Sequence, residues 1–159
     1  FTHSDVTGDT FRLAARLVDA GANVDELSYQ LMRRQSPARA QLYAKAISQL
    51  RFFLDGKLAV AYVSQQMLSD YGLKQDATSG IVDFALTIDG VEVSACIMEY
   101  KRGQYKASLR SKGKVNVNAV AGTFGGGGHI LASGCMLFGE TEEVFDRLRY
   151  AVYQNLEDV

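Results

Sequence analysis

The sequence predicts an α/β domain, or alternatively an α+β domain, in which helices flank a mixed β-sheet and a helical connector precedes it. Two patterns carry this prediction. Apolar residues recur at helical spacing through the first fifty residues, and short alternating strand patterns separated by turns follow from about residue 51. The 159 residues, with 47% hydrophobic and 22% charged residues, suit one compact domain with an extension. We therefore divide the chain into a connector, residues 1–50, and a sheet domain, residues 51–159.

The connector is predicted to contain three helices. The first begins after the N-cap Thr7 and ends near Gly21. Its apolar stripe consists of Phe11, Ala14, Ala15 and Val18. The second covers Val24 to Arg34, and the third begins at Ser36-Pro37, an N-cap followed by proline in the first turn. The third helix continues through Leu50. These apolar faces need a surface to pack against.

The sheet domain opens with a predicted hairpin at Asp55-Gly56, a strong two-residue turn signal between Arg51–Leu54 and Lys57–Val63. A short helix capped by Ser64 follows. The remaining helices are predicted at Asp76–Thr87, at Asn116–Thr123, and from Val144 through Leu156. Alternation predicts further strands at Val91–Tyr100, Tyr105–Arg110 and Ile130–Phe138.

Charge is concentrated in one segment. The net charge is −1, which excludes a broadly basic nucleic-acid binder. Residues 99–118, however, carry six cationic side chains against one acidic one, and residues 119–138 carry no charged side chain. This compact cationic segment predicts a small anion site. Absence of a ~20-residue apolar run or a signal peptide predicts no membrane association and a cytoplasmic location, with Cys96 and Cys135 as buried thiols.

The run Gly125-Gly126-Gly127-Gly128-His129 is the centre of the functional prediction. Consecutive glycines are conformationally costly, so a positive φ or the close approach of another group must require them. Bare peptide N–H groups can bind an anion, and the His129 side chain can donate to a phosphate oxygen. The run matches neither a Walker P-loop nor a dinucleotide-binding fingerprint, and by itself it favours a plain glycine turn with a surface histidine.

The strand before the glycines supplies cationic groups. Lys106, Ser108 and Arg110 are predicted on one strand face, with Ser111 at the strand end. An arginine fork can bind a phosphate in bidentate fashion, and Ser108 or Ser111 can add a hydroxyl donor. A solvated strand face is the competing interpretation. Asn116 and Asn118, before the short helix, are interpreted as helix caps, and Asn118 alternatively as a group that contacts a ribose or base.

These motifs in order resemble the DHH-associated C-terminal domain of DHH phosphoesterases, and more narrowly the oligoribonuclease and pAp-phosphatase branch. The resemblance consists of Ser108 to Ser111, Val115 to Asn118, Phe124 to His129, and Ala132-Ser133-Gly134. The family pattern has a second alanine where Ser133 stands. The hairpin and the Gly80 to Asp83 helix also fit, so the resemblance covers nearly the whole chain.

The resemblance implies that catalytic metals lie elsewhere. Family members bind two Mn²⁺ ions through an N-terminal DHH domain, and the Asp-His-His triplet does not occur here. The pair His3 and Asp5 is too small for a metal site, and both are interpreted as loop residues. We expect Mn²⁺, or another divalent metal, to be bound upstream of Phe1 in a longer protein, with no metal ligand in this chain.

By the same resemblance, this chain binds the substrate. Arg110, with Ser108 or Ser111, would hold a phosphate, Gly126, Gly127 and Gly128 would close over the phosphate to be cut, and His129 would stabilise developing charge or the leaving group. The implied substrates are short RNA, 3′-phosphoadenosine 5′-phosphate (pAp), or dinucleotides. The implied partners are the protein's own N-terminal DHH domain and a second copy in a homodimer.

Other functions stay open at this stage. One is a nucleic-acid-binding module without chemistry, as in the related domains attached to alanyl-tRNA synthetase and RecJ-type exonucleases. Another is part of a cyclic or linear dinucleotide phosphodiesterase in a signalling protein. A third is an interaction domain that uses the apolar face of the helical arm.

Overall fold

The computed structural model describes residues 6–156 in two compact units, one ending at Ser36 and the other beginning at Pro37. The first unit contains α1 (Gly8–Asp19), α2 (Val24–Ser28) and the π-helical turn η1 (Tyr29–Arg33). No residue of these three elements is buried. Thr7 is the N-cap of α1, as predicted, and the second predicted helix is present but changes to π-helical geometry after Ser28. The loop expected at His3 and Asp5 lies outside the described residues.

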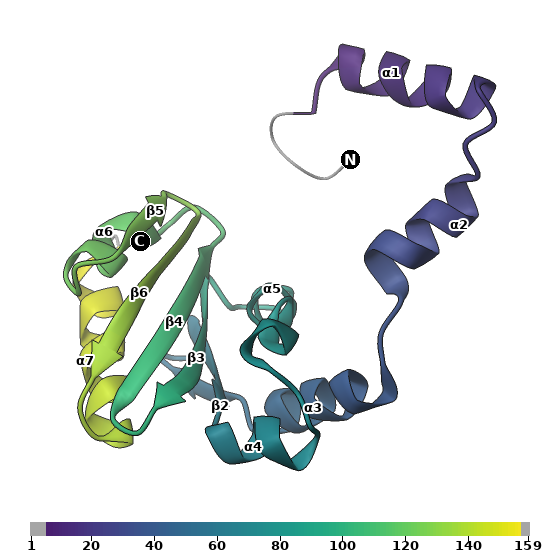
Figure 1. The fold of residues 1–159 in the computed structure, drawn as a ribbon. Coiled ribbons are helices and arrows are strands. Elements are labelled where there is room, and N and C mark those ends of the chain that lie inside the picture. The colour runs from purple at the N-terminus through teal and green to yellow at the C-terminus, as the bar shows by residue number, and fades with distance from the viewer. Residues whose placement is uncertain (1–5, 157–159) are drawn as a thin grey trace. The chain divides into compact units, whose positions relative to one another are not determined.

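The second unit is built on a six-stranded mixed sheet in the order β1-β2-β3-β4-β6-β5 (Figure 1). Its strands are β1 (Arg51–Phe53), β2 (Leu58–Val63), β3 (Val93–Lys101), β4 (Gln104–Ser111), β5 (Gly127–His129) and β6 (Ala132–Phe138). Its helices are α3 (Pro37–Ser48), α4 (Gln65–Asp70), the 3-10 turn η2 (Gln75–Thr78), α5 (Ile81–Leu86), α6 (Val117–Gly122) and α7 (Thr141–Gln154). The predicted α/β class with a mixed sheet is confirmed.

The sheet is mixed because one of its pairings is parallel. Strands β2 and β3 are parallel, with Leu58 opposite Val93, whereas the other neighbouring pairs are antiparallel. The predicted hairpin joins β1 to β2, and its turn places Asp55 at φ 54° and Gly56 at φ 83°. β2 is buried nearly throughout, as expected for a strand covered on both faces.

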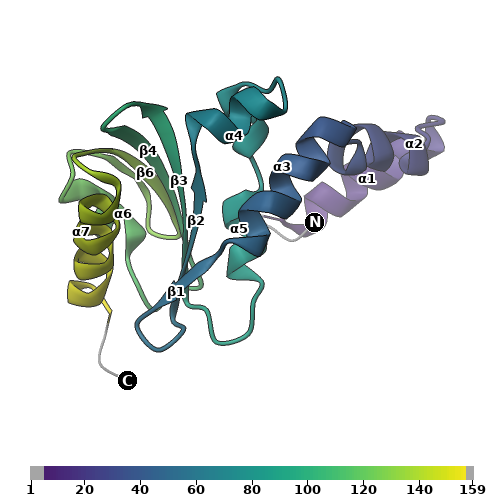
Figure 2. The same ribbon diagram turned by 90° about the horizontal axis from the view of Figure 1, so that it is seen from below.

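Helices cover the two sheet faces to different extents (Figures 1 and 2). On one face, α6 and α7 bury side chains from β2 to β6, including Leu109, Leu137 and Leu148. On the other face, α3, α4 and α5 pack over β2 and β3, where Leu42 of α3 is fully buried. We call this second face the α5 face. α3 therefore belongs to the core of this unit. The division predicted from the sequence, a connector of residues 1–50 and a sheet domain of residues 51–159, stays a prediction.

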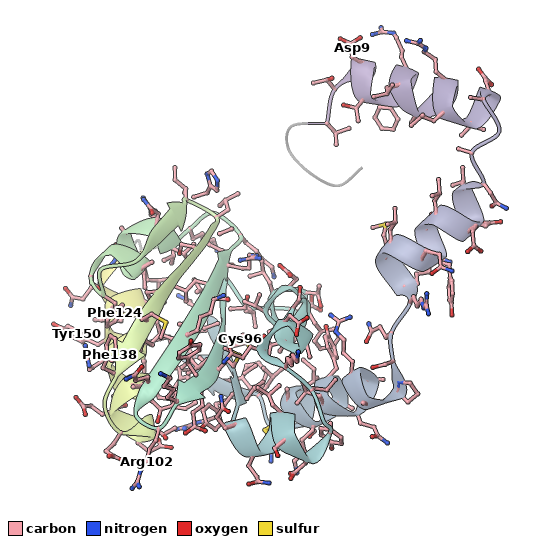
Figure 3. All side chains as sticks on the ribbon, in the orientation of Figure 1. Asp9, Cys96, Arg102, Phe124, Phe138 and Tyr150 are labelled. Atoms are coloured by element: carbon pink, nitrogen blue, oxygen red, sulfur yellow. The ribbon has the colours of Figure 1, made fainter. Side chains whose placement is uncertain are left out.

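The helical cover on the α5 face does not extend across β6. In this strand Ser133, Cys135 and Leu137 are buried toward α6 and α7, while the intervening residues are more accessible. Phe138, the last of these, is 55% exposed (Figure 3). The outer part of the α5 face is therefore open to ligands.

Two predicted elements differ in the structure. The helix predicted at Asp76–Thr87 is instead η2 followed by α5, because Gly80 between them has φ +87°, which an α-helix cannot accommodate. The glycine run, predicted as a loop, contributes a short edge strand, β5. Ser64 is the predicted cap of α4 and accepts from the Met67 N–H. Asn116 caps α6 by accepting from the Asn118 and Ala119 N–H groups, whereas the cap interpretation of Asn118 is wrong, because Asn118 lies within that helix.

Both cysteines are free and buried, as predicted. Burial raises the pKa of the Cys96 thiol to about 12 and that of Cys135 to about 11, so both stay neutral near pH 7. Within residues 6–156, every helix is too short or too polar to cross a membrane.

Candidate functional site

A cleft of about 400 Å³ lies on the α5 face, between β4 on one side and the η2–α5 segment on the other. The predicted alternation of β4 is confirmed, and Lys106, Ser108 and Arg110 line this cleft. Cys96 and Met98 of β3 also line it, and Cys96 is shown in Figure 3. The cleft thus combines an apolar β3 wall with cationic and hydroxyl groups, the mixture typical of small-ligand sites.

Arg110 is the most constrained of the three β4 side chains. Its Nε donates to Oδ1 of Asp83 on α5 at 2.8 Å, and its Nη1 donates to the Leu109 carbonyl at 3.0 Å. The Arg110 side chain is 32% exposed. The side chains of Lys106 and Ser108, in contrast, form no hydrogen bond or ion pair with residues 6–156, so both side chains can bind a ligand without breaking a protein contact.

The glycine run shows both of the predicted reasons for glycine. Gly125 has φ +71°, with open space where a side chain would start. At Gly126, a Cβ atom would lie 2.3 Å from the Gly134 carbonyl oxygen and 2.5 Å from the Cβ of Cys135. The backbone at Gly126 therefore packs directly against β6.

Gly125, Gly126 and Gly128 donate their N–H groups to acceptors outside the β5–β6 ladder, so these three are not free to bind an anion, and Gly127 lies in that ladder opposite Gly134. Gly125 donates to the Gly122 carbonyl, Gly126 donates to the Ala121 carbonyl, and Gly128 donates to Oδ1 of Asn118 at 2.8 Å. Asn118 thus holds the outer edge of β5 against α6. Its side-chain amide nitrogen forms no hydrogen bond with residues 6–156.

The strand register aligns the predicted site residues in rows across the sheet. Arg110 pairs with Ala132, and Ala132 pairs with His129 on β5. Ser108 pairs in the same way with Gly134, which pairs with Gly127. With strands about 4.8 Å apart, the Cα atoms of Arg110 and His129 are roughly 10 Å apart, within reach of a single nucleotide.

The residues between these groups are small. Ala132 and Gly134 of β6 stand between β4 and β5, so little side-chain volume rises from this part of the α5 face. His129 is exposed, and its imidazole forms no hydrogen bond with residues 6–156. The sheet therefore offers a shallow, nearly bare surface bordered by Arg110 and Ser108 on one side and by the glycine run on the other.

Two other serines in the motif lie apart from this surface. Ser111 is on the opposite face of β4, 5% exposed, and its Oγ accepts from the Gly113 N–H. Ser133 is also buried, and its hydroxyl donates to the Val117 carbonyl. The structure brings together Ser108 and Arg110 but not Ser111. It also explains why serine is compatible with position 133, because the buried hydroxyl has an acceptor.

The remaining cations of residues 99–118 are dispersed. Lys112 donates to the Ile88 carbonyl, Lys114 pairs with Glu92 at 3.0 Å, and Arg102 lies at the turn between β3 and β4 (Figure 3). The local charge of +5 is therefore not a single patch. Of the six cationic residues in this segment, Lys106 and Arg110 line the cleft.

A metal site does not fit the described residues. Between residues 6 and 156, no three His, Cys, Asp or Glu side chains gather closely enough to hold a metal ion.

Comparison with known protein families identifies the fold. Residues 55–158 match the model of the DHHA1 domain, which is more than half of the chain. The chain belongs to the DHHA1 domain family. The match includes the cleft, the cationic strand and the glycine run of this DHHA1 domain.

Curated relatives of the DHHA1 chain are hydrolases. It is 29% identical over 98% of its length to the bifunctional oligoribonuclease and PAP phosphatase NrnA of Thermus thermophilus. It is 32% identical over 94% of its length to a probable enzyme of the same name from Streptococcus mutans. It covers 46% and 48% of those two proteins, about half of their length. Cyclic-di-AMP phosphodiesterase GdpP of Geobacillus thermodenitrificans is 29% identical over 96% of this chain, which covers 23% of that relative.

Among solved structures, an exopolyphosphatase-related protein from Bacteroides fragilis has a TM-score of 0.88 and 25% identity. That match covers 97% of this chain and 45% of the other. A pGpG-specific phosphodiesterase from Vibrio cholerae, at 13% identity and a TM-score of 0.53, shares the fold. Its match covers 95% of this chain and 52% of that one.

Sequence reasoning missed Asp83 as the partner of Arg110. The two residues are 27 positions apart, and no local pattern connects a carboxylate on a short helix with a strand arginine. The role of Asn118 in holding β5 was also missed, because β5 itself was interpreted as a loop.

Proposed function

We propose that this DHHA1 chain is the substrate-binding half of a metal-dependent phosphoesterase that acts on short RNA or on pAp. One observation carries the proposal. Arg110 and Ser108 stand beside a bare part of the sheet whose other border is the glycine run with His129. The NrnA relatives, named as oligoribonucleases and PAP phosphatases, support this choice of substrates.

In this proposal each group has a distinct task. The guanidinium of Arg110 and the ammonium of Lys106 bind phosphate oxygens, and the Ser108 hydroxyl adds a neutral donor. Gly126 and Gly128 keep the backbone close to β6, which leaves room for the substrate above Gly134. His129 donates a hydrogen bond to the phosphate that is cut or to its leaving group. Ser111 supports the turn after β4 through its bond to Gly113.

The divalent metals, Mn²⁺ by resemblance, belong in this proposal to a DHH domain of the same protein. The observed donors are nitrogen-rich cations and hydroxyls, which suit phosphate binding and do not suit metal ligation. We therefore expect this chain, when it is purified alone, to bind the substrate without hydrolysing it. A homodimer and a cytoplasmic location are further parts of the proposal that solution mass and fractionation measurements would test.

Calorimetric titration of the chain with pAp and with pApA tests the binding role. We expect Arg110→Ala to weaken binding about tenfold or more, because a charge-assisted hydrogen bond is lost. His129→Ala should weaken it as well. Arg102→Ala, which removes an equal charge outside the cleft, is the matched control and should change affinity little. Equal losses in the Arg102 and Arg110 variants would show that only net charge matters and would refute the assigned site.

A cyclic-dinucleotide substrate is the second candidate, favoured by the similarity to GdpP along nearly the whole chain. Parallel titrations with cyclic di-AMP and pAp separate the two candidates by affinity. A binding module for long RNA would instead show steep salt dependence that grows with RNA length.

A further inference from the structure

The ion pair between Arg110 and Asp83 connects the proposed phosphate-binding side chain to the opposite wall of the cleft. The two atoms, Nε and Oδ1, are 2.8 Å apart, and both residues line the cleft. The Asp83 side chain is 57% exposed, and exposed ion pairs contribute little to stability. A purely structural purpose therefore leaves this contact poorly explained, whereas orientation of the guanidinium explains it.

The contacts of Arg110 select which of its donors face a ligand. Nε is bound by Asp83, and one Nη1 hydrogen is bound by the Leu109 carbonyl. A guanidinium has five N–H donors, so three remain, all at the terminal nitrogens. These form the end of the fork, which suits two oxygens of one phosphate. Without the Asp83 contact, the side chain would sample several rotamers on the strand surface.

Asp83 is itself held in place by α3. The segment before it carries Gly80, whose carbonyl accepts from the Tyr43 hydroxyl at 3.1 Å. Two further carbonyls of this segment, those of Ala77 and Ser79, accept from the guanidinium of Arg39. The start of α5 is thus fixed to α3 by three side-chain hydrogen bonds. A carboxylate on this anchored turn is well placed to hold a long, otherwise mobile side chain.

We infer that Asp83 is a positioning residue, which orients Arg110 so that its terminal nitrogens bind a substrate phosphate. This inference rests on the proposed function for the identity of the ligand. Asp83 also has an opposing effect, because its negative charge repels the phosphate. The inference states that orientation outweighs this repulsion.

Two substitutions separate orientation from charge. Asp83→Asn keeps an oxygen acceptor for Nε and removes the charge, whereas Asp83→Ala removes both. We expect Asp83→Asn to bind pAp at least as well as the unmodified chain, and Asp83→Ala to bind about tenfold more weakly. In an Arg110→Ala background, Asp83→Ala should cause no further loss, because its effect acts through Arg110. Thermal unfolding of every variant provides the control for folding.

A measurement without ligand tests the same inference. The Nε–H of Arg110 should give a resolved, exchange-protected NMR signal that Asp83→Asn retains and Asp83→Ala loses. Tighter pAp binding in both Asp83 variants, or equal binding in all three chains, would overturn the inference. So would an Arg110 signal that does not respond to Asp83→Ala. If the unmodified chain does not bind pAp but the NMR result holds, the proposed function fails while the positioning of Arg110 stands.

Discussion

Three neighbouring glycines allow the packing of the glycine run to be tested one position at a time. A Cβ at Gly126 would lie 2.3 Å from the Gly134 carbonyl oxygen and 2.7 Å from the Cα of Cys135. Both are backbone atoms of β6, a strand paired on both sides, so neither can move aside cheaply. Gly126→Ala must therefore push β5 away from β6 or displace β6 itself.

The expected costs differ in kind along the run. For Gly126→Ala we expect a loss of about 3 kcal/mol in the free energy of unfolding, at the upper end of overpacking effects. Gly125→Ala has room but requires φ +71°, which costs about 1 kcal/mol for a residue with a side chain. Gly127→Ala meets its nearest neighbouring atom at 3.5 Å without a positive φ, so its effect should stay within about 0.5 kcal/mol.

Urea denaturation of the three variants measures these costs, and hydrogen exchange at the Gly128 N–H reports whether β5 has separated from α6. We expect the Gly128 amide, held by Asn118, to lose protection in Gly126→Ala and to keep it in Gly127→Ala. A neutral Gly126→Ala, or a Gly127→Ala as costly as Gly126→Ala, would refute the packing explanation.

Two further predictions concern Asn118 and the buried thiol. Asn118→Ala should speed hydrogen exchange at Gly128 and weaken pAp binding while leaving the fold intact, whereas Asn118→Asp, which keeps the acceptor oxygen, should preserve the Gly128 protection. Burial raises the Cys96 pKa from 9.0 to about 12, so the native state disfavours the thiolate. The stabilisation from this difference is complete below pH 9 and is lost as pH rises from about 9 toward 12. Comparing unfolding at pH 8 and 10.5 should show a smaller decline in Cys96→Ala than in the unmodified chain.

The sequence predicted those parts of the fold that depend on local chemistry. The Asp55-Gly56 hairpin, the Asn116 cap and the alternation of β4 follow from turn propensity, backbone hydrogen bonding and period-2 side-chain geometry. The same alternation placed Ser108 and Arg110 on one face. It also separates Ser111 from them, since neighbouring residues of a strand point to opposite sides.

The parts that could not be predicted depend on contacts between distant segments. Pairing of β5 with β6 requires Gly126 to pack against Gly134, and a glycine run has no pattern that distinguishes such an edge strand from a loop. The interruption of the predicted helix at Gly80 could not be predicted, because the apolar residues on both sides of Gly80 recur at helical spacing. The Asp83 contact depends on how far α5 lies from β4, which only tertiary packing sets.

The position of α5 explains why one sheet can serve both the core and a binding surface. α5 covers the inner strands of its face. It reaches as far as β4, where Asp83 of its first turn accepts a hydrogen bond from Arg110. If it extended across β6, Ala132 and Gly134 would be buried and the outer strands would be ordinary core. Small residues at these β6 positions bury little apolar area, so leaving them uncovered costs little stability. A Cβ at Gly134 would lie 3.1 Å from the Ala107 carbonyl oxygen, so a larger residue there, such as in Gly134→Val, would require a small shift of the strand backbone. The proposed binding role therefore requires α5 to leave β6 uncovered, because a helix across β6 would occupy the surface between Arg110 and His129.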